Sequence, residues 1–150
     1  MTSSMFGNIL IVCVGNICRS PMAEFLLRQR LMENDVNISV SSAGLGAVID
    51  HGADEKAIEL MLERGIDIST HRARQLSGEM VKKNELILVM EHWQQKEIEG
   101  LYPYARGRVH LFGKWSDMEI EDPYKKSKEA FNMTFVKIDK ACDEWCKKLW

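Results

Sequence analysis

The residues whose types and spacing best suit chemistry stand together at residues 13–21, which read Cys-Val-Gly-Asn-Ile-Cys-Arg-Ser-Pro. Cys13 offers a sulfur nucleophile, and Arg19 offers a planar fork of N–H donors that matches two oxygens of a phosphate group. The residues between them are few enough for successive backbone N–H groups to turn inward and form an anion-binding nest. The segment therefore predicts a phosphate-binding loop with a thiolate in its floor.

This loop lies between an apolar run, residues 9–12, and a helical pattern, so a strand and a helix must position it. Ser20 is expected to cap that helix, with Pro21 at its first position. The positive end of the helix then points into the same hollow as the loop N–H groups. Such a field favours the thiolate form of Cys13, which is the nucleophilic form.

A second reactive group is needed because the alkoxide or phenolate that leaves a phosphate monoester requires a proton. Asp122, in the sequence Glu-Asp-Pro-Tyr at residues 121–124, is the candidate for this acid. Pro123 biases Asp122 away from helical conformation, and Tyr124 can form a wall for an aromatic substrate. An ordinary Asp-Pro turn at the surface is the alternative interpretation.

The rest of the chain predicts an α/β fold that brings these groups together. Apolar segments predict strands at residues 8–14, 86–90 and 108–112, and an alternation of apolar and polar residues predicts one at 36–41. Helical patterns occur at 21–32, 55–64, 79–83, 92–99 and from about 127 onward. This alternation is typical of a parallel sheet with helices on both faces, here in a single domain over residues 1–150. Because the carboxyl ends of parallel strands share one edge, the Cys13 loop and Asp122 are expected on the same rim.

The composition narrows the function classes. The 150-residue chain has a formal net charge of −2, so it lacks the basic excess of a general nucleic-acid binder. No apolar stretch approaches the roughly 18 residues of a membrane span, and the first residues lack the basic segment of a signal peptide. We therefore expect a cytoplasmic protein with no nucleic-acid partner and no membrane insertion.

The remaining cysteines and apolar positions are expected to be structural. Without an export signal, a disulfide framework is not expected, and the cysteine spacings differ from the two-residue gaps of zinc knuckles. Cys142 and Cys146 fall on the apolar stripe of the last helix, as small core residues would. In the helix at 55–64, the spacing places Ala57, Ile58, Met61 and Leu62 on the core face.

Taken with these motifs, the chain resembles the low-molecular-weight protein tyrosine phosphatases over essentially its whole length. The resemblance is carried by the segment at 12–21 and by the later Asp-Pro-Tyr at 122–124, in that order. The segments at 41–44, 70–74 and 110–113 are similar to the bacterial branch linked to capsule and exopolysaccharide export. The resemblance implies a three-layer fold whose four-stranded parallel sheet has the order 2-1-3-4, and a reaction without a cofactor or metal.

The resemblance also implies roles for individual residues. Cys13 would attack phosphorus and form a cysteinyl-phosphate, and Asp122 would protonate the leaving phenolate and then activate the water that hydrolyses the intermediate. Ser20 would donate a hydrogen bond to the thiolate, and Asn16 would brace the loop. The implied phosphate-binding residues are Val14, Gly15, Asn16, Ile17, Cys18, Arg19 and Ser20.

Other positions carry more than one interpretation. Cys18 either fills space in the loop or, as the resemblance implies, forms a reversible disulfide with the nucleophile. His71 and Glu24 resemble a pair that supports the loop, although a structural histidine is equally ordinary. Leu45 and Tyr124 are expected at the substrate rim. Trp115 is either a residue of that rim or a structural tryptophan.

The implied partner is a phosphotyrosine-containing protein, namely an autophosphorylating bacterial tyrosine kinase of polysaccharide export. Lys125 and Lys126 make the rim basic, which suits a phosphotyrosine with acidic neighbours. An arsenate reductase of the same fold is an alternative, but it needs thiols in mid-chain, and none lies between Cys18 and Cys142. A catalytically silent phosphotyrosine-binding module is a further alternative. A nucleotide-binding domain is disfavoured because the loop lacks the glycine spacing of a dinucleotide site.

Overall fold

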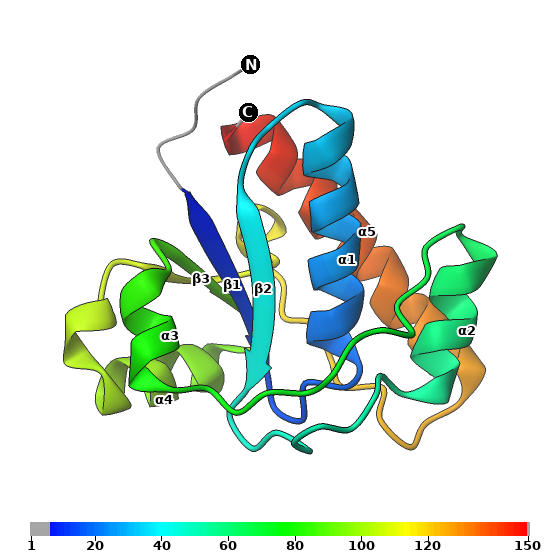
Figure 1. The fold of residues 1–150 in the computed structure, drawn as a ribbon, viewed down its shortest axis with the longest axis horizontal. Coiled ribbons are helices and arrows are strands. Elements are labelled where there is room, and N and C mark those ends of the chain that lie inside the picture. Colours follow the sequence, from blue (N-terminus) through cyan, green and yellow to red (C-terminus); the bar gives the residue numbers. More distant parts are fainter. Residues whose placement is uncertain (1–6, 150) are drawn as a thin grey trace.

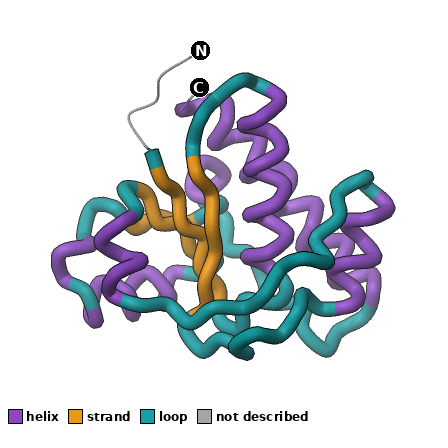
Figure 2. Tube along the Cα trace, viewed as in Figure 1, coloured by secondary structure: helices purple, strands orange, loops and turns teal. Residues whose placement is uncertain are grey.

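The computed structural model describes residues 7–149 of the chain, which fold into a sheet with helices on both faces (Figures 1 and 2). The strands are β1 (Asn8–Cys13), β2 (Ser39–Gly44), β3 (Leu86–Val89) and β4 (Val109–Leu111). The helices are α1 (Arg19–Glu33), α2 (Glu55–Glu63), α3 (Gly78–Lys83), α4 (His92–Leu101) and α5 (Lys128–Leu149), with short 3₁₀ helices at Pro103–Ala105 and Lys114–Ser116.

The sheet is parallel throughout and has the order β2-β1-β3-β4, which confirms the expected fold class. Its central strand β1 is apolar without alternation because both of its faces are buried. Ile9 and Ile11 pack into the core shared with α1 and α5, whereas Leu10 and Val12 pack into the core on the side of α3 and α4. Figure 1 shows these helix pairs on opposite sides of the sheet.

Strand β2 lies three residues later in the sequence than the apolar alternation predicts, at Ser39–Gly44 rather than residues 36–41. The ladder with β1 decides its position, because Asn8 pairs with Ser39 and Cys13 pairs with Gly44. The strand therefore reaches the rim from which the Cys13 loop departs. Gly44 is required there, since a Cβ atom at this position would lie 2.3 Å from the carbonyl oxygen of Val14.

One apolar assignment in α2 is wrong. Leu62 was expected to face the core, but its side chain is 60% exposed, and Leu60 is buried instead. Ala57 and Met61 are buried as expected, and Ile58 is partly buried. In a helix this short, the core-facing stripe is set by which side packs against α5, so a single position can be misassigned.

Helix α5 closes the core on the side of α1 and carries both late cysteines. Cys142 is fully buried, as a core residue, whereas Cys146 is only partly buried. Between residues 7 and 149, no helix is both long and apolar enough to cross a membrane.

Candidate active site

The loop between β1 and α1 leaves the carboxyl edge of the sheet and is fixed from outside by its carbonyl groups. The carbonyl oxygens of Cys13, Val14 and Gly15 accept hydrogen bonds from backbone N–H groups of the segment that follows β2, at 2.9 to 3.1 Å. The carbonyl of Asn16 accepts from Nε2 of His71 at 2.7 Å, and the carbonyl of Ile17 accepts from the N–H of Asp54 at 2.8 Å. The loop carbonyls are thus bound to the surrounding chain.

The N–H groups of the same loop are in the opposite situation. Within residues 7–149, no acceptor takes a hydrogen bond from the N–H groups of Val14 to Cys18. Asn16 has a left-handed backbone with φ of 58°, a conformation that asparagine tolerates and that helps to curl a loop into a nest. Because the loop carbonyls are bound to the surrounding chain and the loop N–H groups are not, these N–H groups can donate to the oxygens of a phosphoryl group.

The sulfur of Cys13 lies in this loop and is buried, with only 3% of the residue exposed. Its Sγ is 2.9 Å from Oγ of Ser20. Nδ2 of Asn16 donates to the same Oγ at 2.7 Å, so the hydroxyl of Ser20 is already an acceptor. When Cys13 is a thiolate it has no proton to give, so the hydroxyl of Ser20 is then the donor to the sulfur.

This arrangement corrects the expected capping role of Ser20. Helix α1 begins at Arg19 with Cys18 as its N-cap, and no side chain caps it. Ser20 lies inside the first turn, and its hydroxyl is held by Cys13 and Asn16 rather than by the helix N–H groups. Pro21 follows in the same turn, where a missing N–H costs nothing.

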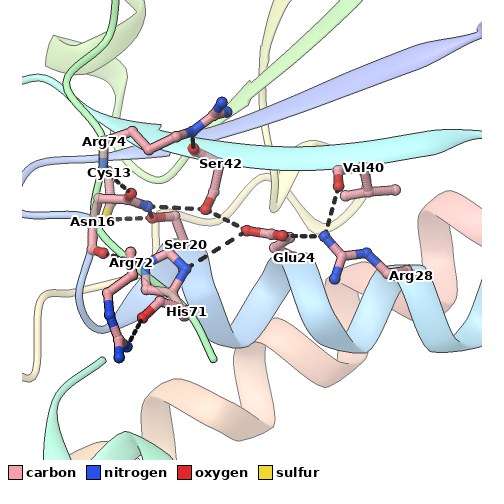
Figure 3. Close-up of polar contacts among 10 residues, drawn as sticks. All are labelled: Cys13, Asn16, Ser20, Glu24, Arg28, Val40, Ser42, His71, Arg72 and Arg74. Carbon is pink, nitrogen blue, oxygen red and sulfur yellow. Dashed lines mark hydrogen bonds and ion pairs between the residues drawn. The ribbon is translucent and has the colours of Figure 1, made fainter. Parts of the chain in front are cut away.

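Asn16 is the centre of a wider polar network (Figure 3). Its Nδ2 also donates to Oγ of Ser42 at 3.0 Å, and its Oδ1 accepts from the N–H of Arg74 at 2.9 Å. Ser42 in turn donates to the carboxylate of Glu24, which also accepts from Arg28. Donation from Asn16 therefore runs in two directions, through Ser42 to Glu24 and to the hydroxyl of Ser20 that contacts the sulfur of Cys13.

His71 supports the loop from the other side of the network. Nε2 contacts the carbonyl of Asn16, so this nitrogen carries a proton, and Nδ1 lies 4.0 Å from Oε1 of Glu24. Burial lowers the pKa of His71, although the Asn16 carbonyl and Glu24 act in the opposite direction. The structure thus brings together the pair of His71 and Glu24 that the sequence suggested.

Arg19 is almost completely buried, with 1% of the residue exposed, and its guanidinium is held in place by fixed acceptors. Nη1 donates to Oε2 of Glu91 at 2.7 Å and to the carbonyl of Ile120 at 2.8 Å. Nη2 lies 3.7 Å from Oδ2 of Asp122. The other donors of the fork remain available to an anion in the loop.

Asp122 lies on the same rim as the Cys13 loop, as the parallel topology predicts. Its Oδ1 accepts from the N–H of Tyr124 at 3.1 Å, an Asx turn that fixes the carboxylate. The side chain of Asp122 is 46% exposed, so it can exchange protons with water. Both an acid and a cationic anion-binding group therefore lie next to the thiol.

These groups surround a hollow of about 200 Å³, lined by Cys13, Val14, Gly15, Ile17, Cys18, Arg19, Gly46, Val48, Asp122 and Tyr124. Tyr124 forms part of the wall. Leu45, expected at the rim, packs instead against the core on the side of α3 and α4, and Val48 lines the hollow in its place. Leu45, the residue after Gly44, faces the core, and the chain then turns so that Gly46 and Val48 line the hollow.

Cys18 lines the hollow beside Cys13 and is also buried. Burial raises the pKa of its thiol, and the negative charges of Asp54 and Asp122 add to the effect. Cys18 therefore stays protonated while the nucleophile reacts.

Trp115 lies away from the hollow. Its ring packs edge-on against Trp145 at a centroid distance of 5.3 Å, and Lys114 and Lys148 lie over it. These contacts favour the interpretation of Trp115 as a structural residue rather than a residue of the substrate rim. Within residues 7–149, no group of three or more His, Cys, Asp or Glu side chains is arranged to hold a metal ion.

Sequence reasoning missed two residues of the site. Glu91 holds Arg19 but lies 72 positions away, next to β3, and an isolated glutamate carries no signal. Its position directly after the third strand, on the rim that ligands use, was the only available indication. Val48 was missed because its exposure depends on the course of the loop after β2.

Comparison with known proteins gives a consistent result. The model of the family "Low molecular weight phosphotyrosine protein phosphatase" matches residues 8–150. A probable low molecular weight protein-tyrosine-phosphatase EpsP from Ralstonia solanacearum is 45% identical over 145 residues, covering 97% of each chain.

Solved structures agree with the family match. Wzb from Vibrio vulnificus, in complex with benzylphosphonate, is 42% identical with a TM-score of 0.91, covering 96% of this chain and 99% of that chain. The YwlE arginine phosphatase, as a cysteine-to-serine mutant with a phosphorylated active site serine, is 26% identical with a TM-score of 0.89, covering 94% of each chain. The chain thus belongs to the low molecular weight phosphotyrosine protein phosphatase family, in the bacterial group that includes EpsP and Wzb.

Proposed function

We propose that the protein hydrolyses phosphotyrosine through a cysteinyl-phosphate on Cys13, with Arg19 as the anion-binding group and Asp122 as the acid. The observation that carries this proposal is their convergence on one hollow. The hydroxyl of Ser20 contacts the sulfur, and Nη2 of Arg19 lies 3.7 Å from Asp122. Family membership over residues 8–150 supports the chemistry and supports a single domain.

In the first step, Sγ of Cys13 attacks phosphorus while the bond from phosphorus to the aryl oxygen breaks. The N–H groups of Val14 to Cys18 and the fork of Arg19 hold the phosphoryl oxygens, where the transition state spreads its negative charge. Asp122 delivers a proton to the departing phenolate oxygen. Glu91 and the carbonyl of Ile120 keep the guanidinium in place, so little reorganisation is needed during reaction.

In the second step, the carboxylate of Asp122 takes a proton from water as the water oxygen attacks phosphorus. The bond between sulfur and phosphorus breaks, and the Cys13 thiolate leaves. The proton of Ser20 then stabilises the negative charge that develops on this sulfur. Inorganic phosphate departs and the loop returns to its starting state.

The walls of the hollow favour an aromatic substrate. Tyr124, Val48 and Ile17 line the hollow and give it apolar and aromatic surface that suits a phenyl ring. Because one structural neighbour is an arginine phosphatase, phosphoarginine is the alternative substrate to weigh against phosphotyrosine. The arginine phosphatase is only 26% identical to this chain, whereas the tyrosine phosphatases are 42 to 45% identical, so we favour phosphotyrosine.

The proposed partner is an autophosphorylated bacterial tyrosine kinase of polysaccharide export, met in the cytoplasm. Lys126 lines a groove next to Asp122 that continues over Lys137 and Met133 of α5. These lysines suit acidic residues beside the phosphotyrosine. Changing Lys126 to Gln should raise KM for an acidic phosphopeptide and leave a basic one unaffected; equal effects on both would contradict this.

The test of the proposal is hydrolysis of aryl phosphates in the presence of a metal chelator. Cys13→Ser should abolish turnover, and Asp122→Asn should reduce kcat by about 10²–10⁴-fold, the usual contribution of a general acid. The loss should be larger for phenyl phosphate than for 4-nitrophenyl phosphate, because nitrophenolate needs less help in leaving. Glu121→Gln, which changes the adjacent exposed carboxylate, is the matched control and should retain activity.

Substrate class is measured with two peptides of one sequence, one carrying phosphotyrosine and one carrying phosphoarginine. We expect kcat/KM to favour phosphotyrosine. Activity that survives Cys13→Ser would contradict the mechanism, whereas a preference for phosphoarginine would leave the mechanism intact and overturn the substrate.

A further inference from the structure

The guanidinium of Arg19 is held by two acceptors that come from different parts of the chain. Its Nη1 donates to Oε2 of Glu91 at 2.7 Å and to the carbonyl oxygen of Ile120 at 2.8 Å. Glu91 follows β3 and begins α4, whereas Ile120 lies between β4 and α5. The position of Arg19 therefore depends on how these two segments are fixed relative to each other.

Gln94, in the first turn of α4, connects the two segments. Its Oε1 accepts a hydrogen bond from the N–H of Met90 at 2.8 Å and another from the N–H of Glu91 at 3.0 Å. The carbonyl oxygen of Met90 in turn accepts from the N–H of Ile120 at 3.0 Å. One side-chain oxygen therefore fixes the backbone of Glu91 and, through Met90, that of Ile120.

These contacts lie in the interior of the protein. Gln94, Met90 and Ile120 are all fully buried. Hydrogen bonds in such surroundings do not compete with water, so the loss of this acceptor would leave buried N–H groups without a partner. Glu91 and Gln94 also form a capping box at the start of α4, which ties the side chain of Gln94 to its own helix. Oε1 of Gln94 is therefore a fixed acceptor that solvent cannot replace.

The nitrogen of the same amide group is in an unfavourable position. Nε2 of Gln94 is buried, and no group within residues 7–149 accepts a hydrogen bond from it. Turning the amide over would not help, because Nε2 would then face the N–H groups of Met90 and Glu91. A buried donor without a partner lowers stability, and an apolar side chain of the same size would avoid this. The amide is therefore explained by the acceptor that it supplies and not by packing.

We propose that Gln94 is a positioning residue for catalysis, which holds the guanidinium of Arg19 at the phosphate-binding loop by fixing both of its acceptors. This inference rests on the proposed reaction at Cys13, in which Arg19 binds the phosphoryl oxygens. The effect crosses the edge of the sheet, because α4 lies on the opposite side of the sheet from α1, which begins at Arg19 (Figure 1). Gln94 does not line the hollow at Cys13, so it acts through Arg19.

This role predicts a loss of activity that does not depend on the leaving group. Arg19 stabilises the phosphoryl oxygens, whereas Asp122 protonates the departing phenolate. Gln94→Met keeps an unbranched side chain but removes the acceptor, and it should lower kcat/KM by about 10- to 100-fold, because a displacement of about 1 Å can cost 100-fold. The factor should be the same for phenyl phosphate and 4-nitrophenyl phosphate, and the inhibition constant for orthovanadate should rise as well.

A double variant separates positioning from a general structural effect. In an Arg19→Lys background the bidentate fork is already lost, so adding Gln94→Met should lower kcat/KM by less than about 2-fold. Two residues that act through one group are non-additive in this way, whereas independent effects multiply. Circular dichroism and thermal unfolding establish that each variant is folded at the assay temperature.

Gln95→Met is the matched control. Gln95 is the next residue of α4, and its Nε2 donates to the carbonyl oxygen of Val109 in β4 at 2.8 Å, so this variant should keep the kcat/KM of the wild type. The inference is overturned by wild-type kcat/KM in folded Gln94→Met, by an equal loss in Gln95→Met, or by an undiminished loss in the Arg19→Lys background. Each of these results would leave the reaction at Cys13 in place, whereas activity that survives Cys13→Ser would overturn the reaction itself.

Discussion

Replacing Ser20 with Ala removes the hydroxyl that contacts the sulfur of Cys13. The contact is 2.9 Å long and buried, and the hydroxyl must be its donor when Cys13 is a thiolate, because the thiolate has no proton. The thiolate is the attacking group in the first proposed step and the leaving group in the second. The substitution should therefore impair both steps, and most visibly the release of phosphate from the enzyme.

The magnitude follows from the kind of bond that is lost. A hydrogen bond to a charged group contributes about 1.5–3 kcal/mol, and about 1.4 kcal/mol corresponds to a factor of ten in rate. We expect breakdown of the cysteinyl-phosphate to slow by about 10- to 150-fold. Rapid-mixing kinetics with 4-nitrophenyl phosphate should then show a burst of nitrophenolate followed by a slower steady state.

Ser42→Ala is the matched control for this experiment. Ser42 also accepts a hydrogen bond from Nδ2 of Asn16, at 3.0 Å, but its hydroxyl donates to Glu24 and does not contact Cys13. Ser42→Ala should thus disturb the loop without creating a burst. If the two variants show the same kinetics, Ser20 acts only by holding Asn16, and the proposed role at the sulfur is refuted.

Three further predictions concern the loop and its surroundings. Gly44→Ala should lower the melting temperature and kcat together, because the added Cβ would lie 2.3 Å from a loop carbonyl, whereas Gly100→Ala, with no atom within 4 Å, should be neutral or stabilising. Burial lowers the pKa of His71, so near neutral pH the unfolded chain binds more protons at this residue than the folded one. The free energy of unfolding should therefore fall as the pH drops below about 6.5, and urea titrations should show a weaker pH dependence in His71→Gln. Peroxide should inactivate the wild type reversibly by linking Cys13 to Cys18, and Cys18→Ser should lose recovery by thiol reductants; equal recovery in both proteins would contradict this link.

The sheet was predictable because β1 and β3 are dominated by continuous apolar runs and the connections contain helices. The shared rim was also predictable, because Cys13 and Asp122 both follow the carboxyl ends of parallel strands, which lie at one edge of the sheet. The position of β2 was not predictable from its own residues. Its ladder with β1 extends through Ser41, Ser42 and Gly44, small residues with weak strand preference that pack closely under the loop.

The remaining differences arise where a residue's role depends on distant partners. Ser20 has the sequence signal of a helix cap, but the sulfur of Cys13 and the amide of Asn16 compete for its hydroxyl. Glu91 acquires its role only when the fold brings it to the buried guanidinium of Arg19. Local patterns cannot contain such information, because it lies in the relative placement of strands and loops.

The most direct test of the central claim is to locate phosphate on the enzyme during turnover. The wild type and Asp122→Asn are mixed with an aryl phosphate, quenched in acid and digested, and the peptides are examined by mass spectrometry. We predict a single phosphoryl group on the peptide that contains Cys13, and on the sulfur of Cys13 rather than Cys18. A phosphorylated residue elsewhere, or sustained turnover by Cys13→Ala, would contradict the account.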